Sequence, residues 1–180
     1  MKRYALSVVI LGVLTLAALP GCKSMSSEEL KNSVEILDYQ SVWVSKYYQP
    51  WPPRLILVPQ ISFRVKNTGT KPLNYVNFNA VYNFKADPEN FGDAFMAAIR
   101  GQAVPPGGTS PVITLRSNLG VDGKNLAGIR DNPAWKQAEV RLFASSKGSM
   151  PVLLGVFDVS RDIDFKEPEP VEPKKEEIKK

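Results

Sequence analysis

Hydrophobic and polar side chains alternate with a period of two over most of residues 34–164. The pattern is clearest in residues 76–84, whose shared apolar face consists of Val76, Phe78, Ala80, Tyr82 and Phe84. Asparagines occupy most of the positions between them. This alternation is typical of an antiparallel strand with one face in the core and the other in water.

Six other segments carry strand-like spacing of apolar residues and are expected to form strands: residues 34–44, 55–65, 94–99, 112–117, 135–144 and 152–159. Turn-forming residues separate them at 67–72, 104–110 and 145–149. In the first of these turns Gly69 is able to take a positive φ. The strands on either side of that turn, 55–65 and 76–84, are expected to pair as a hairpin.

Two stretches between the strands are polar or irregular. Asp87 to Asp93 is expected to be a connection, and although its carboxylates suggest Ca²⁺, their spacing does not fit an EF-hand loop. We therefore interpret it as a solvated loop. Residues 120–133 are irregular, with a brief helix expected at 125–129.

Seven short strands with Gly/Pro turns and few helices predict an all-β fold, a single antiparallel β-sandwich. The stretch Ile61 to Leu73, with its V-x-N-x-G pattern, resembles the second strand and turn of immunoglobulin-like or fibronectin-like bacterial envelope domains. The P-P-G-G-T-S run at 105–110 is similar to turns of those domains and of the LEA14-like fold. The resemblance implies an immunoglobulin-like sandwich over residues 34–164 and transfers no activity.

The amino terminus has the organisation of a signal peptide. Lys2 and Arg3 precede an apolar run of about 15 residues that ends at Leu19, too short to span the ~30 Å hydrocarbon core. The sequence Leu19-Pro20-Gly21-Cys22 resembles the lipobox of bacterial lipoproteins.

That resemblance implies recognition of Leu19 and Gly21 by the peptidase, cleavage before Cys22, and acylation of Cys22 by fatty acids such as palmitate. More than one acyl chain gives stable membrane anchoring. Because Lys23 stands where enteric lipoproteins carry an inner-membrane retention aspartate, the outer membrane is the expected location. The alternative is an ordinary secreted protein with an incidental cysteine.

The chain therefore divides into a signal peptide (1–21), a lipidated tether (22–33), the sandwich (34–164) and a tail (165–180). The tether is short and polar, with one helical turn expected at 27–31. The tail is made almost wholly of Pro, Glu and Lys, a composition that cannot bury enough apolar surface to fold, so it is expected to be disordered.

Composition excludes several classes of function. Histidine is absent and Cys22 is the only cysteine, which removes imidazole-based zinc sites and the common nucleophile–base pairs. We expect no enzyme, no metal and no cofactor. After loss of Lys2 and Arg3 the net charge is about +3, without a dense basic cluster, so nucleic-acid binding is not expected.

An aromatic cluster is the strongest candidate binding site. Tyr47, Tyr48 and Trp51 lie in or next to the proline-rich stretch Gln49-Pro50-Trp51-Pro52-Pro53, which the prolines make a loop. Exposed aromatics on a rigid loop suit recognition of a partner or glycan. The interpretation that the sequence favours is that they plug the open end of the sandwich, while Trp43 belongs to the core.

Four basic residues at strand positions, Arg64, Lys66, Arg116 and Arg141, are interpreted as marking solvent-facing sides. Together these features predict a membrane-anchored envelope lipoprotein with a non-enzymatic binding or scaffolding module. Its expected partners are the membrane, through Cys22, and an envelope protein, reached through a sheet edge or the Trp51 loop. The alternatives are a small-ligand or glycan receptor and, least favoured, an envelope hydrolase.

Overall fold

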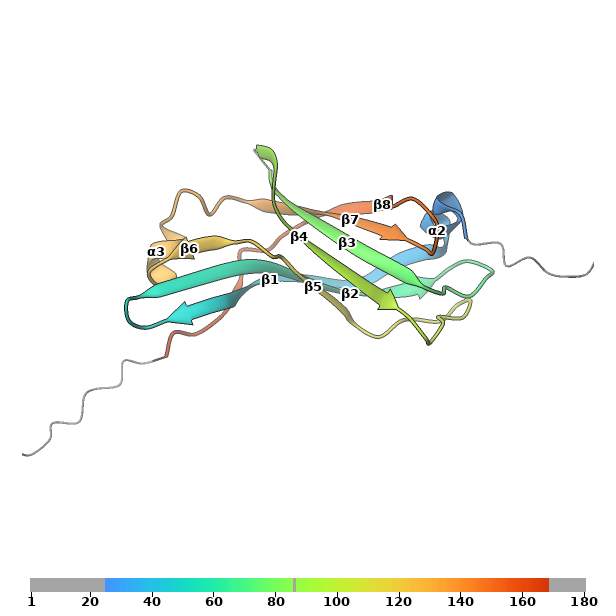
Figure 1. Ribbon diagram of the computed structural model, residues 1–180, viewed down its shortest axis with the longest axis horizontal. Helices are drawn as coiled ribbons and strands as arrows, with labels where there is room; N and C mark the ends of the chain where they lie inside the picture. Colours follow the sequence, from blue (N-terminus) through green and yellow to red (C-terminus); the bar gives the residue numbers. More distant parts are fainter. Residues whose placement is uncertain (1–24, 86, 169–180) are drawn as a thin grey trace, which may run out of the picture.

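The computed structural model describes residues 25–85 and 87–168, and within them two sheets pack as a β-sandwich that is not closed into a barrel (Figure 1). The predicted fold class is therefore confirmed. The expected signal peptide with Leu19 and Gly21, the acylation site Cys22 and residues 169–180 of the tail lie outside the described residues. No helix within the described ranges is long and apolar enough to cross a membrane.

The first sheet is built on a long antiparallel hairpin of β1 (Val34–Gln49) and β2 (Arg54–Asn67). The free side of β2 pairs with β5 (Ile113–Arg116) and then with β6 (Val121–Gly123). A two-residue strand, β9 (Ile163–Asp164), pairs parallel to the middle of β1. These pairings fill both sides of β2.

The second sheet has the strand order β4-β3-β7-β8, all antiparallel. Its strands are β3 (Val76–Phe84), β4 (Asp87–Ile99), β7 (Ala138–Ser145) and β8 (Val152–Asp158). Two short helices complete the fold: α2 (Ser27–Ser33) and α3 (Leu126–Arg130), the latter one residue later than the sequence predicted.

The expected hairpin of residues 55–65 and 76–84 is wrong. The two segments form β2 and β3, which belong to different sheets. Because β2 is paired on both sides, the chain after Asn67 has to cross to the opposite layer, where β3 finds β4 and β7. The expected loop at Asp87 to Asp93 is also wrong, since β4 begins at Asp87.

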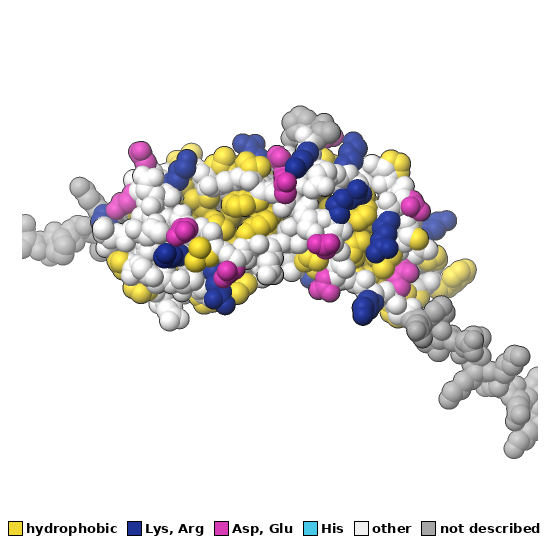
Figure 2. All heavy atoms as spheres, turned by 180° about the vertical axis from the view of Figure 1, so that it is seen from behind, with side chains coloured by type: hydrophobic (Ala, Val, Ile, Leu, Met, Phe, Trp, Pro, Cys, Tyr) yellow, Lys and Arg dark blue, Asp and Glu magenta, His cyan; other side chains and the backbone are white. Residues whose placement is uncertain are grey.

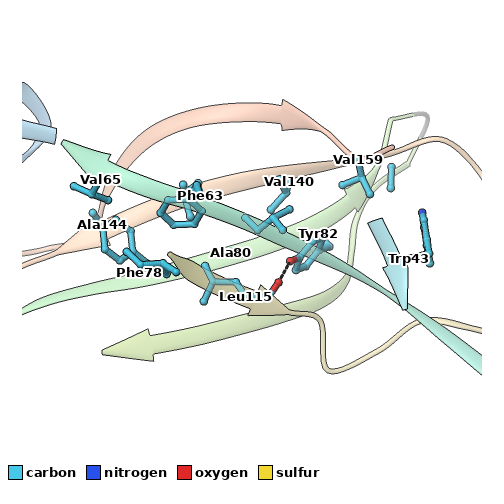
Figure 3. Packing of buried hydrophobic residues seen from close by; sticks show 14 of the residues in the cluster. Trp43, Phe63, Val65, Phe78, Ala80, Tyr82, Leu115, Val140, Ala144 and Val159 are labelled. Atoms are coloured by element: carbon cyan, nitrogen blue, oxygen red, sulfur yellow. Dashed lines mark hydrogen bonds between the residues drawn. The ribbon is translucent and has the colours of Figure 1, made fainter. Parts of the chain in front are cut away.

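The core lies between the sheets and follows the predicted alternation. Phe63 of β2 meets Phe78 of β3 edge to face at 5.4 Å, and the hydroxyl of Tyr82 donates to the backbone oxygen of Leu115 at 2.8 Å (Figure 3). Burial raises the pKa of Tyr82 far above its ordinary value. Trp43 is buried against Trp135 at 5.9 Å, so its predicted place in the core is confirmed.

Helix α2 extends the folded domain into residues that the sequence assigned to the tether. Ser26 caps it by accepting a hydrogen bond from the backbone N–H of Glu29, and Leu30 is fully buried in the common core. Glu29 pairs with Lys71 at 2.7 Å, and this hydrogen-bonded contact lowers the pKa of the Glu29 carboxyl. The folded part thus begins before residue 34.

The turn after β2 is held by one buried amide. The Nδ2 group of Asn67 donates to the carbonyls of Lys71 and Val104, each at 2.9 Å, and its Oδ1 accepts from the N–H of Gly69. A Cβ on Gly69 would lie 2.4 Å from Oγ of Ser33 in α2. Gly69 is required here for close approach and has no positive φ, contrary to the expectation, whereas Gly107 in the 104–110 turn does (φ 74°).

Candidate functional site

The long β1–β2 hairpin carries the predicted aromatic cluster to one end of the molecule. Helix α2 lies at the opposite end, as Figure 1 shows. A strand rises about 3.3 Å per residue, so the 16 residues of β1 span roughly 50 Å between these ends. We call residues 47–54 the hairpin tip.

Trp51 projects from the hairpin tip with 84% of its surface exposed. Its backbone is nevertheless held, because the amide of Gln49 donates to the Trp51 carbonyl at 2.9 Å while accepting from the hydroxyl of Tyr47. The neighbouring prolines 50, 52 and 53 are also exposed. The interpretation that this cluster plugs the sandwich is therefore wrong for Trp51, because prolines and a tight turn hold the indole beyond the last core residue.

Tyr48 is the member of the cluster that packs inward. It is half-buried, its ring centroid lies 5.4 Å from that of Phe165, and it contacts the common core. Beside it lies a groove of about 340 Å³ bounded by the tip, the start of α3 and the end of the described chain. Its lining is formed by Tyr48, Gln49, Pro50, Pro53, Lys124, Asn125, Glu167 and Pro168.

Charged groups border this aromatic surface. The guanidinium of Arg54 lies 5.9 Å from the centre of the Tyr47 ring, which is 42% exposed, and pairs with Asp122 of β6 at 2.7 Å. The hydrogen bond with Asp122 raises the pKa of Arg54. In the groove, Glu167 accepts a hydrogen bond from the backbone N–H of Leu126 at 2.8 Å, which fixes its carboxylate at the start of α3.

The structure thus brings the three predicted residues to one end and adds groove residues that the sequence did not suggest. Lys124, Asn125 and Glu167 follow the tip by at least 70 positions, and no local pattern connects them with it. Seen from behind, hydrophobic side chains protrude at this end of the molecule, with Lys and Arg side chains over the adjoining surface (Figure 2).

The side chains of this surface are of the types that suit molecular recognition. A flat indole, two phenol rings and three prolines give a large amphipathic area at low entropic cost. No group of three or more His, Cys, Asp or Glu side chains within the described ranges could hold a metal ion, at the tip or elsewhere.

The basic strand residues lie where the sequence placed them. Arg64, Arg116 and Arg141 are exposed, and Lys66 is half-buried. Arg64 and Lys66 approach carboxylates of the neighbouring strand, Asp38 at 3.8 Å and Glu35 at 3.6 Å. Such exposed pairs contribute little to stability.

Comparison with known proteins adds little. No family model and no curated protein matches the sequence. Among solved structures, a protein designated ApaA from Bordetella pertussis is similar over 71% of this chain and 94% of its own, with 14% identity and a TM-score of 0.37.

Proposed function

We propose that this protein is a lipid-anchored lipoprotein of the cell envelope, on the outer membrane, whose sandwich serves as a non-enzymatic binding or scaffolding module. The support for the anchor is the lipobox-like sequence ending at Cys22. The support for binding is one observation: an indole 84% exposed on a held backbone, at the end of the domain opposite α2.

The two ends of the sandwich give this proposal its geometry. Helix α2 is the first element of the described domain, and the hairpin tip lies roughly 50 Å away along β1. An anchor before α2 therefore presents the tip away from the bilayer. An exposed tryptophan in that place suits contact with another envelope molecule better than insertion into the membrane that holds the protein.

A glycan or small-ligand receptor is the alternative that the tip also supports. The Trp51 indole offers a face for stacking, and the adjacent groove supplies an amide, an ammonium and a carboxylate from Asn125, Lys124 and Glu167. A hydrolase is the weakest candidate, because the sequence has no histidine and its single cysteine is the acylation site.

The anchor is tested by labelling cells with radioactive palmitate. Wild-type protein should incorporate the label and sediment with the outer membrane, whereas Cys22→Ser should do neither. Label retained by Cys22→Ser, or an unmodified wild-type protein with its leader intact by mass spectrometry, would remove the anchor from the proposal.

The tip is tested by crosslinking in intact cells with a photoreactive residue at position 51. The expected product is a discrete adduct that forms through position 51 but not through position 150. Met150 is a suitable control because it is hydrophobic and 77% exposed but lies at the α2 end, where Ser27 donates to its carbonyl. Adducts identical at both positions would contradict a tip-directed partner, and binding of envelope glycans that is lost in Trp51→Ala would favour the alternative.

A further inference from the structure

Besides the hairpin tip, the fold leaves a second surface open, on the side of the sandwich where the edges of the two sheets approach each other. β4 and β5 are edge strands of different sheets, and they come together at one point. There Asn118 donates its N–H to the carbonyl of Asp93 at 3.0 Å, and its Oδ1 accepts from the Asp93 N–H at 2.9 Å. A Cβ on Gly92 would lie 2.1 Å from Oγ of Ser117, so a larger residue here would have to displace the Ser117 side chain.

Beyond this junction the strands separate and enclose a cleft of about 430 Å³. We call it the edge cleft. Its lining is Asp93, Ala94, Phe95, Met96, Thr114, Leu115, Arg116 and Asn118. The junction closes one end of the cleft, because Asn118 occupies the position at which an added strand would pair with Asp93.

Backbone hydrogen-bonding groups face the edge cleft from both sides. In antiparallel strands, successive residues turn their N–H and C=O groups to alternate sides. Since Asp93 turns its groups outward to Asn118, Phe95 turns its own to the same open side. Directly after β5, the N–H of Ser117 donates to the carbonyl of Pro59 in β2 at 2.9 Å, so Arg116 and Thr114 turn their backbone groups outward.

Several exposed apolar side chains lie in or beside the edge cleft. Phe95 is 66% exposed and Met96 39%, and Val112 and Leu119, just before and after β5, are exposed as well. Edge strands are normally protected by charges, prolines or shortness. Residues 94–99 of β4 read Ala-Phe-Met-Ala-Ala-Ile and carry none of these protections. An uncharged strand edge of this kind is a template for pairing with another strand.

The opposite edge of the second sheet, formed by β8, is covered by contacts with the first sheet. β8 is joined across the sandwich to β1: Tyr39 stacks on Phe157 at 4.7 Å and donates its hydroxyl to the Asp158 carbonyl at 2.9 Å. Ser41 donates to the same carbonyl and accepts from the N–H of Ser160. Side chains of β1 therefore close the β8 side of the sandwich, while the side formed by β4 and β5 stays open.

Charges at the edge cleft favour an acidic occupant. Arg116 lines it and Arg100 follows β4 at its open end; within the described ranges neither has a carboxylate at ion-pair distance. The Nε–H of Arg116 donates to the side chain of Gln60 at 3.2 Å, and its terminal nitrogens have no hydrogen-bond partner in the part of the chain that the structure describes. The one carboxylate of the cleft, Asp93, accepts a hydrogen bond from the side-chain amide of Asn118.

We infer that the edge cleft binds an extended segment of a partner protein, one that alternates apolar and acidic residues and adds as a strand to the β4 or β5 edge. Its backbone pairs with the outward groups of Phe95 or of Thr114 and Arg116. Its apolar side chains cover Met96, which is 39% exposed, and its carboxylates reach Arg116. This site is distinct from the hairpin tip and stands whether or not the tip binds a partner.

The test uses full-length protein in detergent and two fluorescein-labelled hexapeptides, one of alternating Glu and Val and one of alternating Lys and Val. Fluorescence anisotropy should show saturable binding of the Glu/Val peptide, at least about tenfold tighter than the Lys/Val peptide. Hydrogen exchange should slow in residues 94–99 or 113–116 on binding. No saturation up to about 1 mM, or protection confined to other strands, overturns the inference.

Matched variants distinguish binding at the edge cleft from non-specific binding of the peptide. Arg116→Glu should reverse the preference toward the Lys/Val peptide, whereas Arg141→Glu, an exposed arginine on β7, should not. Met96→Glu should weaken Glu/Val binding at least about tenfold through repulsion, and Val156→Glu on the β8 edge should leave it unchanged. Unchanged preference in Arg116→Glu, or a dimer in sedimentation whose β4 edge is protected without peptide, would show that the cleft has another occupant.

Discussion

The two ends of the β1–β2 hairpin are built in opposite ways. At the α2 end, Leu30 and Asn67 are fully buried, and each hydrogen-bonding group of the Asn67 side chain has a partner. At the tip, Trp51 is almost wholly exposed and side-chain hydrogen bonds serve only to hold its backbone. The same pair of strands is therefore packed into the core at one end and exposed to solvent at the other.

This difference shows how one hairpin can be fixed in the domain at one end and offer a binding surface at the other. Burial at the α2 end holds the start of β1 firmly between α2 and the two sheets. The folded domain, and not a flexible linker, therefore sets the position of the tip. A surface whose apolar side chains contribute little to folding is free to contribute to binding. The predictions below test whether stability and binding are divided between the ends in this way.

The largest effect is expected for Leu30→Ala at the α2 end. Removing a fully buried leucine leaves a cavity and should lower the free energy of unfolding by about 2–5 kcal/mol. Urea denaturation followed by circular dichroism measures it. Leu119→Ala, the same change at an exposed site, should cost less than about 0.5 kcal/mol. Equal losses in both variants would mean that α2 is not part of the cooperative unit.

A somewhat smaller loss is expected for Asn67→Ala. The change leaves the carbonyls of Lys71 and Val104 without their amide donor and should lower the free energy of unfolding by about 1–3 kcal/mol. The exposed Asn74→Ala is the control and should be near neutral. A neutral Asn67→Ala would show that the turn holds its shape through its backbone bonds alone.

Alkaline pH should weaken the closed β1–β8 side. Burial raises the pKa of Tyr39 from 10.0 to about 12. Between these values the unfolded chain loses the phenol proton while the folded protein keeps it, so the free energy of unfolding falls as pH rises. Below about pH 10 both states hold the proton and the effect vanishes. Denaturation curves at several pH values should show that the free energy of unfolding falls less steeply with pH in Tyr39→Phe than in the wild type. An identical dependence on pH would mean that Tyr39 ionises freely in the folded state.

The smallest effect on stability is expected for Trp51→Ala, less than about 0.5 kcal/mol. Since Trp43 and Trp135 are buried, Trp51 is also the tryptophan that iodide should quench, and the variant should lose the quenchable fluorescence. A loss of several kcal/mol in thermal or urea unfolding would instead show that the indole packs as core in solution and that the two ends are alike.

Much of the fold could be predicted from the chain because the information was local. Alternation in residues 76–84 located β3 and its buried face, and the prolines after Gln49 located the tip. The prediction that the asparagines on the other face of this segment lie in water is wrong for Asn83, which is buried. Their surroundings depend on neighbouring strands, which the local pattern does not specify.

The candidate sites were less accessible to sequence reasoning. Tyr47, Tyr48 and Trp51 could be identified from composition alone, but the plugging interpretation failed for Trp51 because exposure depends on how far the hairpin extends beyond the core. Strand pairing was the second difficulty: β2 and β3 are consecutive and joined by a turn-rich segment, yet they pair with other strands. The edge cleft follows from that pairing, since it joins Met96 to Arg116 across two sheets.

By itself, the sequence determined the β class, most of the places where the chain turns and most of the residues that enter the core, because period-two alternation and proline or glycine chemistry act over a few neighbouring residues. Only the tertiary structure decided which strand pairs with which, that Leu30 belongs to the core, that Trp51 is presented, and that β4 and β5 leave a cleft open. These are outcomes of competition among many possible partners for the same backbone groups and the same buried space, and that competition is settled by the whole chain at once.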